Sequence, residues 1–260
     1  MDEDRLDDDV ALLWGRRPAA RRGPKPSLTV EDITRAAVAV ADAEGLAAVS
    51  MARVAGEVGF APMALYRHVR SKDDLLLLMA DSAYEEPPEL GEGDWRTRLA
   101  AWAQALFDVL RRHRWFLEIP ISGPPMGPGN LVWLDRALGA MDDTGLDDET
   151  KLAVVMGLLP LAHGQARLTA GLEAGYAAHP ERFARGYGVT LGGLVDPERF
   201  PALSRAISAG VFDDPTSGGG EELGAELDAG FSFAVDCYLT GVAAVVEAVV
   251  ANPSTGGTPA

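Results

Sequence analysis

Apolar side chains recur every three or four residues along most of the chain, which is the period of an α-helix. Between residues 28 and 86, residues that start or stop helices divide this pattern. Ser and Thr can cap a helix N-terminus, Gly favours its end, and Pro fits its first turn. Four helices are predicted here: from the cap Thr29 to Gly45, over 51–58 after the cap Ser50, over 62–69, and from the cap Ser71 to about residue 85.

Beyond residue 86 the same period continues in longer helices separated by Gly- and Pro-rich breaks. Helices are predicted over 94–112, 131–141, 147–172, 197–209 and 223–250, with a loop over 121–129. No stretch shows a convincing strand pattern, and the sequence has no internal repeat or heptad run. The sequence therefore predicts an all-α fold. We expect no membrane span, because Asp236 and Glu247 interrupt the longest apolar run.

Charge is distributed unevenly over the chain, whose formal net charge is −16. Residues 1–15 hold six acids and one arginine, whereas residues 16–75 hold ten bases against seven acids. The remainder of the chain is acidic. Phosphate binding needs Lys and Arg, so only the basic segment fits contact with nucleic acid.

Residues 51–69 have the make-up of a helix-turn-helix, which requires a tight turn and a close helix crossing. Gly59 permits the turn and Ala55 the crossing, while Val58 and Leu65 supply buried contacts. The second helix, which begins at Pro62, is the one expected to enter the major groove of DNA. We therefore expect a helix-turn-helix DNA-binding domain at 28–75 and a larger helical domain at 76–251. A disordered acidic tail and basic arm are expected at 1–27, and a disordered tail at 252–260.

The segment 28–79, and above all the run ALYRHVRSKDDLL at 64–76, resembles the tetracycline-repressor (TetR) family of bacterial regulators. The run FSFAVDCYLTGVAAVV at 231–246 resembles the last helix of the subgroup with a tetracycline-repressor-type C-terminal domain. The resemblance implies an all-helical homodimer that binds a near-palindromic operator. It also implies that a small apolar or aromatic ligand releases the DNA. Where family members place polar base readers, this chain has Pro62, Met63 and Ala64, so hydrogen-bonded readout is thin.

The candidate DNA-binding residues lie on the two helices of the motif, on the start of the next helix and on the basic arm. Arg67 can bind guanine or phosphate, Tyr66 can donate to phosphate, and Lys72 is placed to meet the DNA backbone. The basic arm can contact phosphates or the minor groove, or serve only as a solubilising tail. The full set is Ser50, Met51, Arg53, Pro62, Met63, Ala64, Tyr66, Arg67, His68, Arg70, Lys72, Arg21, Arg22 and Lys25.

Candidate ligand-binding and dimer residues lie in the C-terminal helices. Trp102, Phe116, Trp133, Met156 and His163 can line an effector pocket or simply form core. The long helices at 147–172 and 223–250 are implied to form the dimer interface. Spacing of three and four residues places Val235, Leu239, Val242 and Val246 on one helix face, which we expect to meet the partner.

Other chemistry is weakly represented in the sequence. The single cysteine, Cys237, excludes an intrachain disulfide, so we expect a cytoplasmic protein in which Cys237 is a small buried side chain. No metal or other cofactor is predicted, because the histidines lack ligand spacing. We predict a DNA-binding regulator, most simply a repressor, and not an enzyme. The alternatives are a helical ligand-converting enzyme with a DNA-tethering head and a protein-interaction module that has lost DNA binding.

Overall fold

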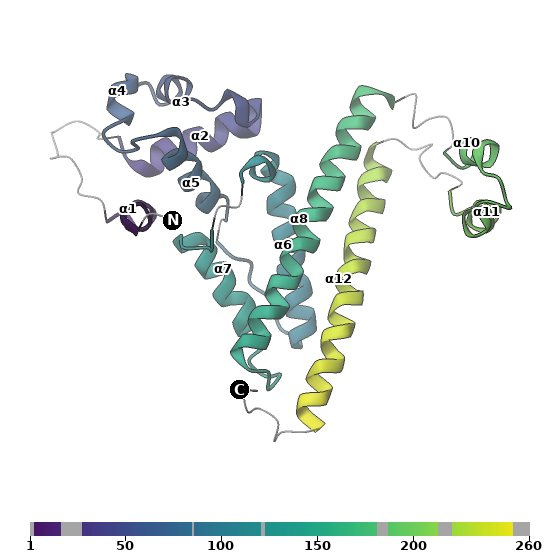
Figure 1. Cartoon of the computed structure of the whole chain (residues 1–260). Helices are drawn as coiled ribbons and strands as arrows, with labels where there is room; N and C mark the ends of the chain where they lie inside the picture. Colours follow the sequence, from purple (N-terminus) through teal and green to yellow (C-terminus); the bar gives the residue numbers. More distant parts are fainter. Residues whose placement is uncertain are drawn as a thin grey trace.

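All regular elements in the part of the chain that the structure describes are helices, as the sequence predicts. The computed structural model describes residues 3–16, 28–84, 86–120, 123–180, 187–212 and 220–251. Figure 1 shows an N-terminal head, α1 to α5, beside a body built from α6, α7, α8 and α12.

The head contains the predicted helix-turn-helix. Its elements are α2 (Val30–Glu44), a 3₁₀ turn η1 (Leu46–Ala48), α3 (Met51–Glu57), α4 (Pro62–Leu65) and α5 (Lys72–Ala83). Thr29, Ser50 and Ser71 cap α2, α3 and α5 through their side chains, as expected from the sequence. Gly59 makes the turn between α3 and α4 with φ of 74°, a conformation that side chains disfavour. Ile33, Val54, Leu65 and Leu75 are completely buried at the centre of the head.

Helix α4 is shorter than predicted. It ends at Leu65, and the chain continues in turns to His68, whose N–H bonds the Leu65 carbonyl at 2.8 Å. These tighter i to i−3 bonds replace helical ones, and Val69 is fully buried after them. No side chain caps the start of α4, because Ala61 offers no side-chain acceptor.

The expectation of a disordered acidic tail is wrong for residues 3–13, which form α1 (Glu3–Leu13). The helix contacts α5 and buries Leu12 in the core of the head. Asp8 accepts a hydrogen bond from Arg70 at 2.7 Å, and Trp14 donates to the Met126 carbonyl at 3.0 Å. The apolar residues 10–13 and the ion pair between Asp8 and Arg70 therefore hold α1 against the head. Most of the basic arm, 17–27, lies outside the described residues.

In the part of the chain that the structure describes, the body is built mainly of four helices and a 3₁₀ turn. They are α6 (Trp95–Arg112), η2 (Arg114–Glu118), α7 (Pro128–Gly139), α8 (Asp148–Ala178) and α12 (Gly220–Ala251). Asp94 and Asp147 cap α6 and α8, as their positions in the sequence indicate. Helix α7 begins three residues earlier than predicted, because Pro128 fits its first turn.

Helices α8 and α12 lie side by side and antiparallel, and α6 packs against both (Figure 1). Phe107 of α6 stacks on Phe231 of α12 with 4.4 Å between ring centroids. Tyr238 crosses α8 at Gly157, where a Cβ would lie 2.0 Å from the phenol oxygen, and donates to the Val154 carbonyl. A side chain at position 157 would therefore displace the Tyr238 phenol from this crossing.

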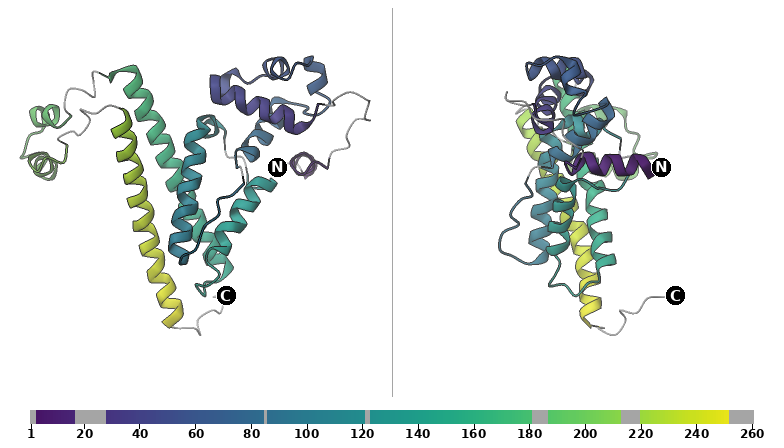
Figure 2. Two further views of the ribbon diagram at one scale, coloured as in Figure 1. Left: turned by 180° about the vertical axis from the view of Figure 1, so that it is seen from behind. Right: turned by 90° about the vertical axis from the view of Figure 1, so that its left-hand side faces the viewer.

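Among the described residues between α8 and α12 are two short helices, α10 (Tyr187–Leu194) and α11 (Pro201–Ser208). Only α11 was expected. Figure 2 shows the pair set apart from the long helices, with the head on the opposite side of the body. Val189 and Leu194 on α10 are about three-quarters exposed, at 79% and 74%.

Candidate DNA-binding surface and effector site

The outer side of α4 and the turn that follows it form the exposed surface of the helix-turn-helix. Leu65 and Val69 are turned inward and fully buried. Pro62, Met63 and Arg67 are exposed, and Ala64 and His68 are half-buried. Tyr66, also exposed, stands beside Arg67 at the C-terminal end of α4. This surface therefore has an apolar half and a half that can donate hydrogen bonds.

Three of the residues predicted to contact DNA are either buried in the head or bonded to other groups of the protein. Met51 is 7% exposed within the core of the head, so the prediction of a side-chain contact to DNA is wrong there. Arg53 donates to Glu44 at 2.6 Å and to Glu57 at 2.7 Å, and both bonds raise the pKa of its guanidinium. Ser50 uses its hydroxyl oxygen to cap α3.

Among the predicted DNA-binding residues that the structure describes, Arg67 and Lys72 are the basic residues available to bind phosphate. Both are exposed, and among the described residues neither forms an ion pair, whereas Arg70 is bound to Asp8. Lys72 is the first residue of α5, so its ammonium adds to the positive end of that helix. Arg21, Arg22 and Lys25 of the predicted arm lie outside the described residues.

A row of aromatic rings runs through the body. Trp102 of α6 meets Trp133 of α7 at 6.1 Å between centroids, and Trp133 meets Tyr84 at 5.8 Å. Tyr84 contacts Phe116 of η2 at 5.5 Å, and Phe116 contacts His163 of α8 at 6.1 Å. Burial and, secondarily, the charge of Asp81 raise the pKa of Tyr84 to about 12, so its phenol is neutral at ordinary pH.

Four of the five predicted pocket residues are therefore members of one row. Met156 is not, because it is 52% exposed on the outer side of α8. The sequence pattern missed Tyr84, which ends the apolar run of α5 and joins Trp133 to Phe116. Among the described residues, no group of three His, Cys, Asp or Glu side chains is arranged for a metal ion.

Helix α7 is held at both ends by side chains of other helices. At its N-terminus, the N-cap residue Gly127 has no side chain, and Asp81 of α5 takes its place. The Asp81 carboxylate accepts from the N–H groups of Gly129 and Asn130 at 3.1 and 3.0 Å, and from the Asn130 side chain at 3.0 Å. A Cβ at Gly127 would lie 2.1 Å from this carboxylate, so the close approach requires glycine.

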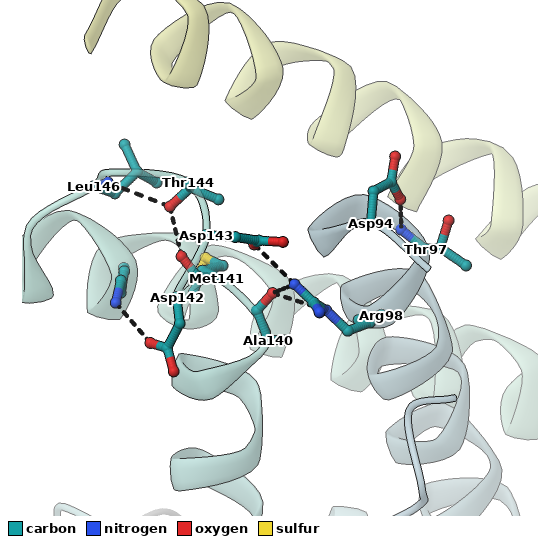
Figure 3. A network of polar contacts seen from close by, with 10 residues as sticks. Asp94, Thr97, Arg98, Ala140, Met141, Asp142, Asp143, Thr144 and Leu146 are labelled. Atoms are coloured by element: carbon teal, nitrogen blue, oxygen red, sulfur yellow. Dashed lines mark hydrogen bonds and ion pairs between the residues drawn. The ribbon is translucent and has the colours of Figure 1, made fainter. Parts of the chain in front are cut away.

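At the other end of α7, Arg98 of α6 donates twice to the Ala140 carbonyl, at 3.1 and 2.8 Å (Figure 3). The same guanidinium donates to Asp143 at 2.8 Å. A carboxylate at the N-terminus and a guanidinium at the C-terminus both complement the helix dipole. Helix α7 therefore connects α5 of the head to α6 of the body, and we call this connection through Asp81 the α7 joint.

A second joint connects the head to the body through η2. Asp42 of α2 accepts a hydrogen bond from Trp115 at 2.6 Å and lies 2.8 Å from Nδ1 of the buried His113. Both joints adjoin the aromatic row, since Trp133 lies on α7 and Phe116 on η2. The sequence pattern missed Asp42 and Asp81, because each resembles an ordinary surface acid of its own helix.

The comparisons with known proteins agree with this architecture. Residues 33–79 match the family described as "Bacterial regulatory proteins, tetR family", and residues 87–246 match "Tetracyclin repressor-like, C-terminal domain". The chain belongs to the TetR family of transcription regulators.

Relatives of this TetR family regulator include a repressor and a regulator solved with a bound ligand, both from Streptomyces. It is 35% identical to HTH-type transcriptional repressor DrrR1 of Streptomyces coeruleorubidus over 246 residues, 91% of this chain and 85% of the relative. Its fold is similar to the TetR family protein ActR of Streptomyces coelicolor in complex with actinorhodin. That likeness has a TM-score of 0.66 and 26% identity, over 85% of this chain and 97% of ActR. A second solved regulator from Streptomyces coelicolor is similar with a TM-score of 0.63 and 26% identity. The likeness covers 86% of this chain and 99% of that regulator.

TetR family regulators bind operator DNA as dimers, and the structure corrects the dimer face expected for this one. Val235, Leu239 and Val242 are 7% exposed or less and pack into their own protomer's core, with Val246 packed beside them. The exposed side of α12 instead carries Phe233, Cys237, Gly241 and Ala244, so the expectation that Cys237 is buried is wrong for the single chain.

The neighbouring helix α8 also has exposed apolar side chains. Leu152, Met156 and Leu168 are 42%, 52% and 52% exposed. By length and composition alone, residues 224–251 of α12 could also cross a membrane. That is weak evidence in a chain whose family is soluble, and the interruption by Asp236 and Glu247 remains. Exposed apolar side chains on two adjacent helices are typical of a protein interface.

Proposed function

We propose that this regulator represses transcription by placing α4 of each protomer in the major groove of a near-palindromic operator. We further propose that a small aromatic molecule, bound against the row of rings, releases the DNA. The major groove is about 12 Å wide and accepts a single helix. Tyr66 and Arg67, exposed in the turn that directly follows α4, then face base edges and phosphates, and Lys72 at the start of α5 binds a phosphate.

The observation that carries the ligand response is the position of the aromatic row between the two joints of the head. Trp133 lies on the helix that Asp81 caps, and Phe116 lies next to Trp115, which donates to Asp42. A flat ligand that separates these rings must shift α7 or η2, and each is bound to the head. Such a ligand weakens DNA binding only if it prefers the shifted arrangement.

The class of effector follows from the same rings. Apolar and aromatic side chains with few polar groups recognise apolar or aromatic molecules of drug size. ActR is solved in complex with actinorhodin, which makes that compound a suitable probe. From the row of rings in this chain we propose a multi-ring aromatic effector. We also propose that the outer face of α8 and α12 forms the homodimer, that the protein acts in the cytoplasm, and that it has no catalytic role.

The test uses an operator selected from a random duplex library with the full-length protein. Actinorhodin is then titrated into the complex while operator binding is followed by fluorescence anisotropy. We expect quenching of Trp102 and Trp133 together with release of DNA. Operator binding that is unaffected while actinorhodin quenches the tryptophans would contradict ligand-released repression. Selection of no operator would contradict DNA binding itself and favour an interaction module, and turnover of the added compound would favour an enzyme.

A further inference from the structure

Among the described residues of the head, the most exposed large apolar side chain lies on the proposed recognition helix. Met63 is 71% exposed, against 42% for Phe60 and 45% for Tyr66. It follows Pro62, the first residue of α4, so the first turn of this helix presents an apolar surface. A solvent-exposed methionine at this position has no packing role in the single chain.

The polar groups that usually read bases are missing or occupied around Met63. Neither Ala61, Pro62 nor Met63 offers a side-chain N–H or O–H donor. In α3, the Ser50 hydroxyl accepts the Arg53 N–H, and the Arg53 guanidinium is held by two glutamates. Arg67 is the exposed guanidinium of the recognition segment, and it lies one helical turn from Met63.

The major groove offers one apolar feature among its base edges, the C5-methyl group of thymine. We propose that Met63 recognises thymine in each operator half-site by packing its thioether against this methyl group. The inference rests on the proposed placement of α4 in the major groove. The positive groups of Arg67 and Lys72 bind phosphates and hold the helix on the DNA, so that the apolar tip of Met63 meets base edges and not solvent.

Replacement of thymine by uracil tests this contact, because it removes the methyl group and leaves the base pair's hydrogen-bonding groups unchanged. Each thymine of the selected operator is replaced singly by uracil, and the affinity of the full-length protein is measured at fixed salt. Burial of one methyl group corresponds to about a fourfold change in affinity. We expect a loss of about fourfold at one or two thymines of each half-site and none at the others.

Two variants assign the effect to Met63. Met63→Ala is expected to bind the thymine and uracil operators equally, whereas Met63→Leu keeps the discrimination. Lys72→Ala is the matched control, since it weakens binding to both operators by the same factor. Both Met63 and Lys72 are exposed, so these substitutions leave the core of the head intact.

Every outcome bears on the proposal. Operators that lack thymine in the half-site, or uracil replacements that are neutral at all positions, would overturn thymine recognition while leaving DNA binding established. Discrimination that persists in Met63→Ala would overturn the role of Met63. Failure to select any operator would instead overturn the placement of α4 on which the proposal rests.

Discussion

Removal of the Asp81 carboxylate is expected to loosen the head from the body by uncapping α7. Asp81→Ala deletes three hydrogen bonds of 3.0–3.1 Å and leaves the N–H groups of Gly129 and Asn130 without that acceptor. Loss of an N-cap costs about 0.5–2 kcal/mol, and the favourable interaction of a carboxylate with a helix N-terminus adds about 0.3–1 kcal/mol. We therefore expect the free energy of unfolding to fall by about 1–3 kcal/mol.

The same change is expected to lower the coupling between effector and operator, because α7 no longer moves with α5. Urea unfolding at one fixed protein concentration measures the stability, since the stability of a dimer depends on concentration. Operator affinity with and without actinorhodin measures the coupling. In Asp81→Ala we expect actinorhodin to quench Trp133 as before, with a smaller loss of DNA affinity.

Asp135→Ala is the matched control, because Asp135 is an exposed carboxylate near the middle of α7. Its substitution should change stability by less than about 0.5 kcal/mol. Asp81→Asn keeps an acceptor oxygen and should lie between the parent and Asp81→Ala. Suppose instead that Asp81→Ala is as stable as the control and that effector and operator remain coupled as in the parent. That result would refute the role of Asp81 in joining the head to the body.

Four further substitutions test other parts of the structure. Phe233→Glu, on the exposed side of α12, should give folded monomers by light scattering. Val242→Glu buries a charge in its own protomer and should lower the free energy of unfolding by several kcal/mol. Folded monomers from Val242→Glu and an intact Phe233→Glu dimer would reverse the assignment of the faces. Lys72→Ala should weaken binding to all DNA sequences alike and lower the slope of log affinity against log salt by about one, and an unchanged slope would remove the phosphate contact. Asp8→Asn should release Arg70 for a phosphate and tighten DNA binding at low salt; weaker binding would show that α1 supports the interface.

Features fixed by neighbours along the chain could be predicted from the sequence. The caps Thr29, Ser50 and Ser71 act within one turn of their own helices, and the glycine turn at Gly59 is equally local. These features specify the helix-turn-helix. The aromatic residues of the body were identified by type, although their order in a row depends on Tyr84 from another helix.

Features that depend on packing between distant segments could not be predicted. Helix α12 is apolar on most of its surface, so spacing alone could not decide whether Val242 or Phe233 faces the core. Asp81 caps α7, which begins 47 residues later along the chain, at Pro128. The missing cap at Gly127, in the run GPGN, was the one local sign that another segment must supply an acceptor. The acidic charge of residues 3–13 concealed the apolar end that docks α1.

Ligand-released repression is tested most directly by the affinity of the full-length protein for its selected operator, measured at increasing actinorhodin. Coupling between two linked sites is typically about 1–3 kcal/mol, so the affinity should fall by about 5–150-fold as the tryptophan fluorescence saturates. By reciprocity, operator DNA should weaken actinorhodin binding by the same factor. An operator affinity that stays constant across the whole titration would contradict the release of DNA by an aromatic effector.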